Sequence, residues 1–146
     1  MFWKNKTLKQ LTPEEWESLC DGCAKCCLVR LEDPETKEVA CTSLCCDLLD
    51  TNSCRCQDYK NRFQLVPGCV QLSADNIEEF KWLPKTCSYR LIHEGKDLPS
   101  WHPLVTGQHD STHTYQMSVK DKVKNHSEVP EEEWPNYIIQ DYPDLN

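Results

Sequence analysis

The spacing of apolar residues near the N-terminus predicts a short helix. In the stretch LTPEEWESLC, Thr12 can cap a helix, Pro13 suits its first turn and Glu15 completes a capping box. Residues three and four positions apart lie on one face of a helix. The residues that this spacing places together are Trp16, Leu19, Cys20 and Cys23. The helix should therefore deliver the first cysteines at or near its C-terminal end.

Three further segments have the patterns of regular structure. Apolar residues at 28–32 and 38–44 flank the turn sequence PETK, which predicts a short β-hairpin. The stretch SADNIEEFKWLP predicts a helix capped by Ser73, and TCSYRLIHEG predicts another capped by Thr86. From residue 96 onward, Pro, Gly and Trp indicate irregular backbone. The predicted fold class is α+β, with short helices and a short hairpin around a cysteine cluster.

Composition narrows the class of protein. The chain has 146 residues, of which 38% are hydrophobic, and its mean hydropathy is −0.69. This is a thin supply of core residues, and small polar chains often supplement such a core with disulfides or metals. The net charge of −8, without a dense Lys/Arg cluster, argues against a nucleic-acid partner. No apolar run is as long as a membrane span, and the N-terminus lacks a secretory leader pattern, so we expect no membrane partner and a cytoplasmic location.

Eleven cysteines change this picture most, and four of them lie within CDGCAKCC at Cys20–Cys27. Cytoplasmic thiols are kept reduced, so such spacing is typical of metal binding or catalysis. Four thiolates suit tetrahedral Zn²⁺, and successive C-x2-C spacing also suits an iron–sulfur cluster, so the spacing does not choose the metal. Disulfides remain the alternative if the chain is exported. A redox-active or nucleophilic thiol is a third interpretation. C-x-x-C indicates such a thiol mainly near a βαβ unit, and this sequence does not offer one.

The vicinal pair Cys26–Cys27 indicates that more than one site is present. Neighbouring side chains point in different directions, so one thiol can join Cys20 and Cys23 while the other faces a second ion. Downstream thiols would complete the coordination. They are Cys46, Cys54, Cys56, Cys69 and Cys87. Burial explains Cys41 or Cys45, taken singly, at least as well as ligation does.

Several non-cysteine residues lie close to these segments. Arg55 and Arg62 could compensate the negative charge of a thiolate site, and could equally be solvated. His102 could ligate a metal or form a hydrogen bond near one, although packing between its neighbours is favoured. The five tryptophans supply apolar area that partly compensates for the small number of aliphatic core residues. The alternative is that they line a peptide-binding groove.

Three stretches carry a resemblance to a known family. WESLCDGCAKCC, CRCQDYKNRFQLVPGC and FKWLPKTCSYRLIHEGKDLPSWHPLVTG resemble the bacterial YcgN-like family, a branch of the YkgJ-type zinc- or iron-chelating (CxxCxxCC) domains. The resemblance implies metal chelation and no particular reaction. It implies as ligands Cys20, Cys23, Cys26, Cys27, Cys46, Cys54, Cys56, Cys69 and Cys87. The broader group's C-x-x-Y-x-x-R-P element is similar to Cys56, Tyr59 and Arg62 here, with Phe63 in place of proline.

We therefore expect a cysteine-rich protein that binds Zn²⁺ or iron. Its predicted division is an N-terminal extension at 1–11, a metal-chelating domain at 12–107, and an acidic, proline-containing tail or strap of the same domain at 108–146. Three classes of function stay open: a structural zinc module serving a protein partner, an iron–sulfur redox or accessory protein, and an enzyme. The enzyme has least support, because it needs an open coordination position and the sequence shows no acid–base pair or phosphate loop.

Overall fold

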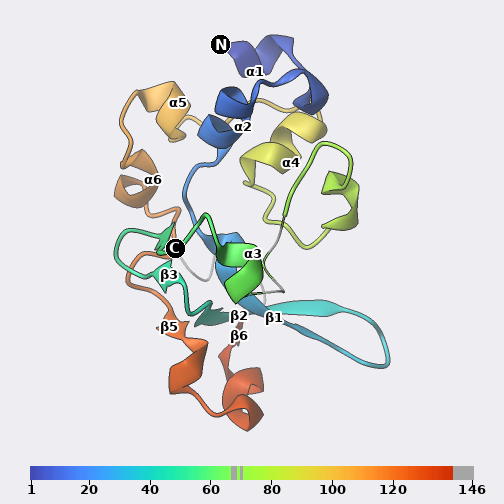
Figure 1. Cartoon of the computed structure of the whole chain (residues 1–146), viewed down its shortest axis with the longest axis vertical. Coiled ribbons are helices and arrows are strands. Elements are labelled where there is room, and N and C mark those ends of the chain that lie inside the picture. The colour runs from blue at the N-terminus through green and yellow to red at the C-terminus, as the bar shows by residue number, and fades with distance from the viewer. Residues whose placement is uncertain (67–68, 70, 140–146) are drawn as a thin grey trace. The chain divides into compact units, whose positions relative to one another are not determined.

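The computed structural model describes residues 1–66, 69 and 71–139, which divide into two compact units. The helical unit comprises residues 1–22 and 71–115, and the sheet unit comprises the described residues among 23–70 and 116–146 (Figure 1). The helical unit contains α1 (Phe2–Asn5), η1 (Leu8–Gln10), α2 (Pro13–Leu19), η3 (Ile77–Glu79), α4 (Ser88–His93), α5 (Pro103–Thr106) and α6 (Ser111–Thr114). The sheet unit contains η2 (Lys25–Cys27), β1 (Leu28–Glu32), β2 (Val39–Cys45), β3 (Leu49–Asp50), β4 (Arg55–Cys56), α3 (Arg62–Leu65), β5 (Lys124–Asn125), η4 (His126–Glu128), η5 (Glu131–Tyr137) and β6 (Ile138–Ile139). The expected α+β class is confirmed.

Helix α2 begins as the sequence predicts. The Thr12 hydroxyl accepts a hydrogen bond from the Glu15 amide at 3.1 Å, and the Glu15 carboxylate accepts one from the Thr12 amide at 3.0 Å. The helix ends at Leu19, because Cys20 is extended and Gly22 has a left-handed φ of +75°. The prediction that Cys20 and Cys23 continue the face of this helix is therefore wrong.

Of the two helices predicted after residue 70, the first does not form and the second does. Around Asn76, side-chain bonds replace a helical turn, since its Oδ1 accepts from the Ser73 amide and its Nδ2 donates to the Gln71 carbonyl. Only the short η3 follows, so the prediction of a helix capped by Ser73 is wrong. Helix α4 does form, and its N-cap is Cys87 rather than Thr86.

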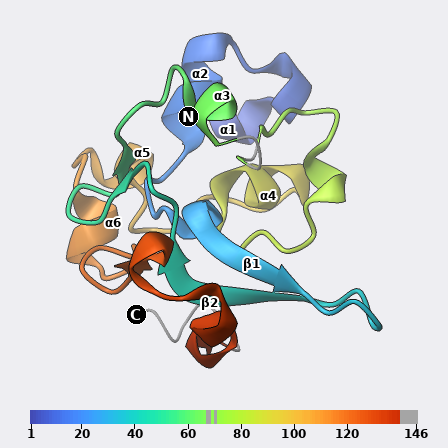
Figure 2. The same ribbon diagram turned by 60° about the horizontal axis from the view of Figure 1, so that its bottom comes forward.

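The predicted hairpin is confirmed as β1 and β2, which Figures 1 and 2 show side by side as an antiparallel ribbon. Cys45 pairs with Leu28 at the base of the ribbon, and Cys41 pairs with Arg30 after a local irregularity. Strand β2 also pairs in parallel with β5 and antiparallel with β6. The chain after residue 115 thus completes the sheet that the cysteine segments begin.

A small apolar core holds the sheet unit together. Its buried members are Ala24, Leu28, Cys45, Leu49, Cys54 and Val119, and the partly buried Cys27, Val123 and Ile139 pack against them. Two of the six buried members are cysteines and one is alanine, so this core contains little aliphatic area. The thin core expected from composition is therefore most evident in the unit that carries most of the cysteines.

The C-terminal segment divides between the two units. Residues 108–115 pack in the helical unit, and the described residues from 116 onward pack in the sheet unit. The residues at 1–11 are also packed, with Trp3 and Leu8 buried. The domain boundaries given from the sequence stay a prediction. Within the described residues, no helix is both long and apolar enough to cross a bilayer.

Removing the cap of α2 should destabilise the helical unit modestly. Thr12→Ala is expected to lower its free energy of unfolding by about 1 kcal/mol, because the Glu15 amide loses its acceptor. Thr12→Ser keeps the hydroxyl and is the matched control. Urea denaturation followed by circular dichroism measures both. Equal midpoints for the two variants would contradict the capping role.

Candidate metal centre

At the base of the hairpin, the segments that carry Cys26 and Cys46 lie next to each other. Cys26 lies in η2, two residues before the first residue of β1, and Cys46 follows the last residue of β2. The Cys46 amide donates to the Cys27 carbonyl at 3.0 Å, which extends the β1–β2 ladder by one step. The Ala24 backbone makes the approach to η2 possible, because its left-handed φ of 64° turns the chain just before Cys26. The two cysteines are thus placed by backbone geometry.

Cys56 is added by the small β3–β4 ladder. It pairs with Leu49, whose amide donates to the Cys46 carbonyl at 3.1 Å. The Gln57 amide donates to the Leu48 carbonyl at 2.6 Å, so β4 is bound to the turn that follows Cys46. The Cys69 amide, after α3, donates to the Val66 carbonyl at 2.9 Å.

The electrostatic environment of Cys69 identifies its neighbours. Burial raises the pKa of the Cys69 thiol, the Arg62 guanidinium lowers it, and three other thiols raise it further. Those thiols are Cys26, Cys46 and Cys56. We call Cys26, Cys46, Cys56 and Cys69 the four-cysteine group. Its members come one each from four separate segments of the sheet unit, whereas structural zinc sites typically take their ligands in closely spaced pairs.

The turn after Cys46 is held from two sides. The Leu48 amide donates to the Cys46 sulfur with an N···S distance of 3.4 Å. On the other side, the Ser127 hydroxyl donates to the Asp47 carboxylate, and His126 Nε2 lies 3.3 Å from the same group. The Ser127 hydrogen bond is the main cause of the lowered pKa of Asp47. The segment after β5 therefore fixes the loop that carries Cys46.

Arg62 is held rigidly within the same unit. Its Cζ lies 3.6 Å from the centre of the Tyr59 ring and 4.1 Å from that of Phe63, and its Nη1 donates to the Tyr59 carbonyl at 2.6 Å. Stacking between two rings fixes the plane of the guanidinium. A fixed cation beside Cys69 favours the thiolate over the thiol.

The other five predicted ligands lie outside the four-cysteine group. Cys54 is part of the apolar core, and burial raises its pKa. Cys27 packs against that core. Cys23, which lies shortly before Cys27 in the sequence, is also buried. Cys20 and Cys87 belong to the helical unit, where they cap the C-terminal end of α2 and the N-terminal end of α4. Their roles as ligands stay a prediction.

His102 anchors the backbone next to Cys20. It is fully buried, its Nε2 lies 2.8 Å from the Leu19 carbonyl oxygen, and its Nδ1 accepts from the Leu104 amide at 3.0 Å. The Thr112 hydroxyl donates to the Asp21 carbonyl at 2.6 Å. Both ring nitrogens of His102 thus bind backbone, so the histidine positions the segment 19–21 and is not a ligand. Its isolated position in the sequence gave no signal of this contact with residues more than eighty positions away.

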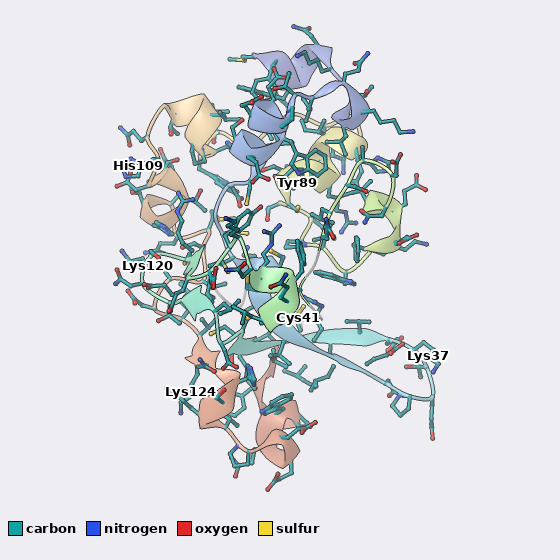
Figure 3. All side chains as sticks on the ribbon, in the orientation of Figure 1. Lys37, Cys41, Tyr89, His109, Lys120 and Lys124 are labelled. Carbon is teal, nitrogen blue, oxygen red and sulfur yellow. The ribbon has the colours of Figure 1, made fainter. Side chains whose placement is uncertain are left out.

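Cys41 and Cys45 lie in β2, where Figure 3 labels Cys41. Cys45 is completely buried, and loss of solvation is the main cause that raises its pKa to about 11. A thiol with so high a pKa is protonated at neutral pH and behaves as a small apolar side chain. Burial, the alternative weighed from the sequence, describes Cys45 well.

The donor chemistry of the four-cysteine group fits zinc or iron. Four sulfurs from one unit supply the number and type of donors that a tetrahedral thiolate site needs, and a backbone N–H and the Arg62 guanidinium lie beside them. Within residues 1–66, 69 and 71–139, no three His, Cys, Asp or Glu side chains are close enough together to hold an ion. Coordination would therefore require these sulfurs to move closer together. All eleven cysteines are thiols rather than disulfides in the structure.

Comparison with known proteins gives the family and the class of metal site. Residues 19–88 match the family model described as "Putative zinc- or iron-chelating domain", CxxCxxCC. A UPF0260 protein of Pseudomonas putida is 49% identical over 94% of this chain and 92% of its own length. One of Pseudomonas fluorescens is 52% identical over 94% and 93%. The chain belongs to the UPF0260 family. YcgN is the Escherichia coli member of UPF0260, so the YcgN-like resemblance is confirmed. No solved structure matches the chain.

Loss of the Arg62 guanidinium should weaken metal retention in this UPF0260 protein. Arg62→Ala is expected to speed metal transfer to a chelator by roughly tenfold, the lower end of the effect of removing an outer partner of a metal ligand. Arg55→Ala is the control, because Arg55 adjoins Cys56 in sequence but is exposed. A colorimetric chelator follows the transfer at fixed pH. Unchanged kinetics in Arg62→Ala would remove Arg62 from the site.

Proposed function

We propose that this protein chelates zinc or iron through Cys26, Cys46, Cys56 and Cys69, and that the bound ion completes the fold of the sheet unit. The observation that carries the proposal is that the β1–β2 and β3–β4 ladders bring the segments of Cys26, Cys46 and Cys56 together. Cys69 lies where these three thiols raise its pKa. Thiolate ligation also requires reduced cysteines, which supports a cytoplasmic location.

A structural role is favoured over a catalytic one. Four thiolates saturate a tetrahedral ion and leave no coordination position for a substrate or water. The sheet unit has a small core, and Cys45 and Cys54 are two of its six buried members. A bound ion would therefore stabilise this unit. In a site of this kind the free energy of metal binding is part of the free energy of folding. The metal-free chain should therefore be partly unfolded in its sheet unit.

Metal content measured on anaerobically purified protein tests the proposal. A colourless protein with one zinc ion per chain would match the four-cysteine group alone. Two ions per chain would add a second site outside the four-cysteine group. A brown protein with iron and acid-labile sulfide would instead assign the thiols to an iron–sulfur cluster, with a redox or accessory role. Protein without metal, and with thiols that do not take up zinc, would refute chelation.

A further inference from the structure

The helical unit contains two adjacent cavities, and no cysteine lines either of them. One measures about 670 Å³ and the other about 340 Å³, and their linings share Leu8, Lys9 and Ala74. The first reaches Trp3 and Ile92, and the second reaches Trp16. Each volume lies in the range of natural ligand sites. We call this surface the lysine groove.

The floor of the lysine groove is apolar and fixed. Trp3 and Leu8 are each 7% exposed, and the Trp3 indole nitrogen donates to Asp97 at 2.9 Å. Trp16 packs on Tyr89 with the ring centres 4.6 Å apart, and the Tyr89 hydroxyl donates to the Trp16 carbonyl. Trp16 is held in this way and is partly exposed, so it provides contact area at little cost in conformational entropy, as the anchors of interfaces do.

The rim of the groove is basic although the chain is acidic. Four lysines line the two cavities against two aspartates, in a chain of net charge −8. They are Lys4, Lys6, Lys9 and Lys96. Each pairs with a carboxylate, but the pairs of Lys4 and Lys9 are well exposed, and Lys96 is 64% exposed beside the less exposed Glu94. Exposed pairs contribute little to stability. An anionic ligand can therefore replace those carboxylates at small cost.

We infer that the lysine groove binds a linear acidic peptide segment of a partner protein, with apolar side chains in the two cavities and carboxylates on the lysine rim. Two cavities separated by Leu8 and Lys9 suit two anchor side chains of one extended chain better than one compact ligand. The positive rim selects the acidic sequence between the anchors and increases the rate of association.

Selection from random linear peptides displayed on phage, with the purified full chain as target, tests this inference. The expected outcome is a set of sequences rich in Asp and Glu that contain apolar residues. A labelled copy of the selected peptide then gives the affinity by fluorescence anisotropy. Lys9→Glu combined with Lys96→Glu should weaken binding by about tenfold or more, because like charges now face the peptide.

The matched control is Lys37→Glu combined with Lys124→Glu, which makes the same charge change at two exposed sheet-unit lysines labelled in Figure 3. This variant should bind the peptide within about threefold of wild type, since neither lysine lines the groove and exposed charges are screened. Circular dichroism and metal content verify that both double variants are folded. Selection of no acidic consensus, or equal weakening in both double variants, would overturn the inference. Complete displacement of the peptide by inorganic phosphate at similar concentration would also overturn it, and would identify a free-anion site instead.

Discussion

Cys69→Ser is expected to remove one metal ion per chain and to loosen the sheet unit. Cys69 is the member of the four-cysteine group whose thiol responds to the other three, so its loss leaves three sulfurs around the ion. Metal affinity should fall by more than about 100-fold, beyond the roughly 10–100-fold effect of losing an outer partner. Competition with a chelator, followed by metal analysis of the dialysed protein, measures the change.

The loosening of the sheet unit should be measurable at individual backbone amides. The amides of Cys46, Leu49 and Gln57 donate hydrogen bonds that hold the group's segments together. Hydrogen exchange at these amides should accelerate in Cys69→Ser, because local opening no longer costs the metal-binding free energy. Cys41→Ser makes the same chemical change at a half-buried cysteine outside the group and should leave exchange and metal content near wild type. Retention of wild-type affinity by Cys69→Ser would exclude the four-cysteine group as the site.

Local sequence signals predict the parts of the fold that depend on neighbouring residues. The capping box at Thr12 and Glu15 and the hairpin of β1 and β2 each involve groups close in sequence, and both are confirmed. The prediction fails where a side chain takes over a backbone bond. Asn76 binds both Ser73 and Gln71, and this arrangement competes with helix in a way that residue propensities do not resolve.

The grouping of the cysteines could not be predicted for a different reason. The family resemblance gave nine ligands but no partition, because which thiols meet depends on the β1–β2 and β3–β4 ladders and on where Cys69 falls after α3. Distant contacts such as Asp47 with Ser127, or His102 with Leu19, likewise leave no trace in sequence spacing. The proposed partition therefore depends on the folded chain, through these ladders and the surroundings of Cys69, and not on spacing.

His102→Ala is expected to destabilise the helical unit strongly. The ring is fully buried, and its removal leaves a cavity and two backbone groups, the Leu19 carbonyl and the Leu104 amide, without their partner. A loss of about 3 kcal/mol in the free energy of unfolding follows from one cavity and two unsatisfied groups. His102→Asn can still cap α5 through the Leu104 amide but cannot reach Leu19 in the same way, so it should lose clearly less. Urea denaturation of the three proteins at pH 7.5 gives the order.

The same histidine should make stability depend on pH. Burial lowers the pKa of His102 below its ordinary value of 6.5, although the Leu19 carbonyl and Asp21 act in the opposite direction. The unfolded chain therefore binds a proton at this residue before the folded chain does, and the stabilisation is fully present above about pH 6.5 and is lost as the pH falls below it. The difference in unfolding free energy between wild type and His102→Asn should accordingly shrink from pH 7.5 to pH 5.5. Because both proteins carry the same cysteines and the same other histidines, loss of metal in acid largely cancels in this difference. A difference that stays constant over this range would show that His102 is not held neutral by burial.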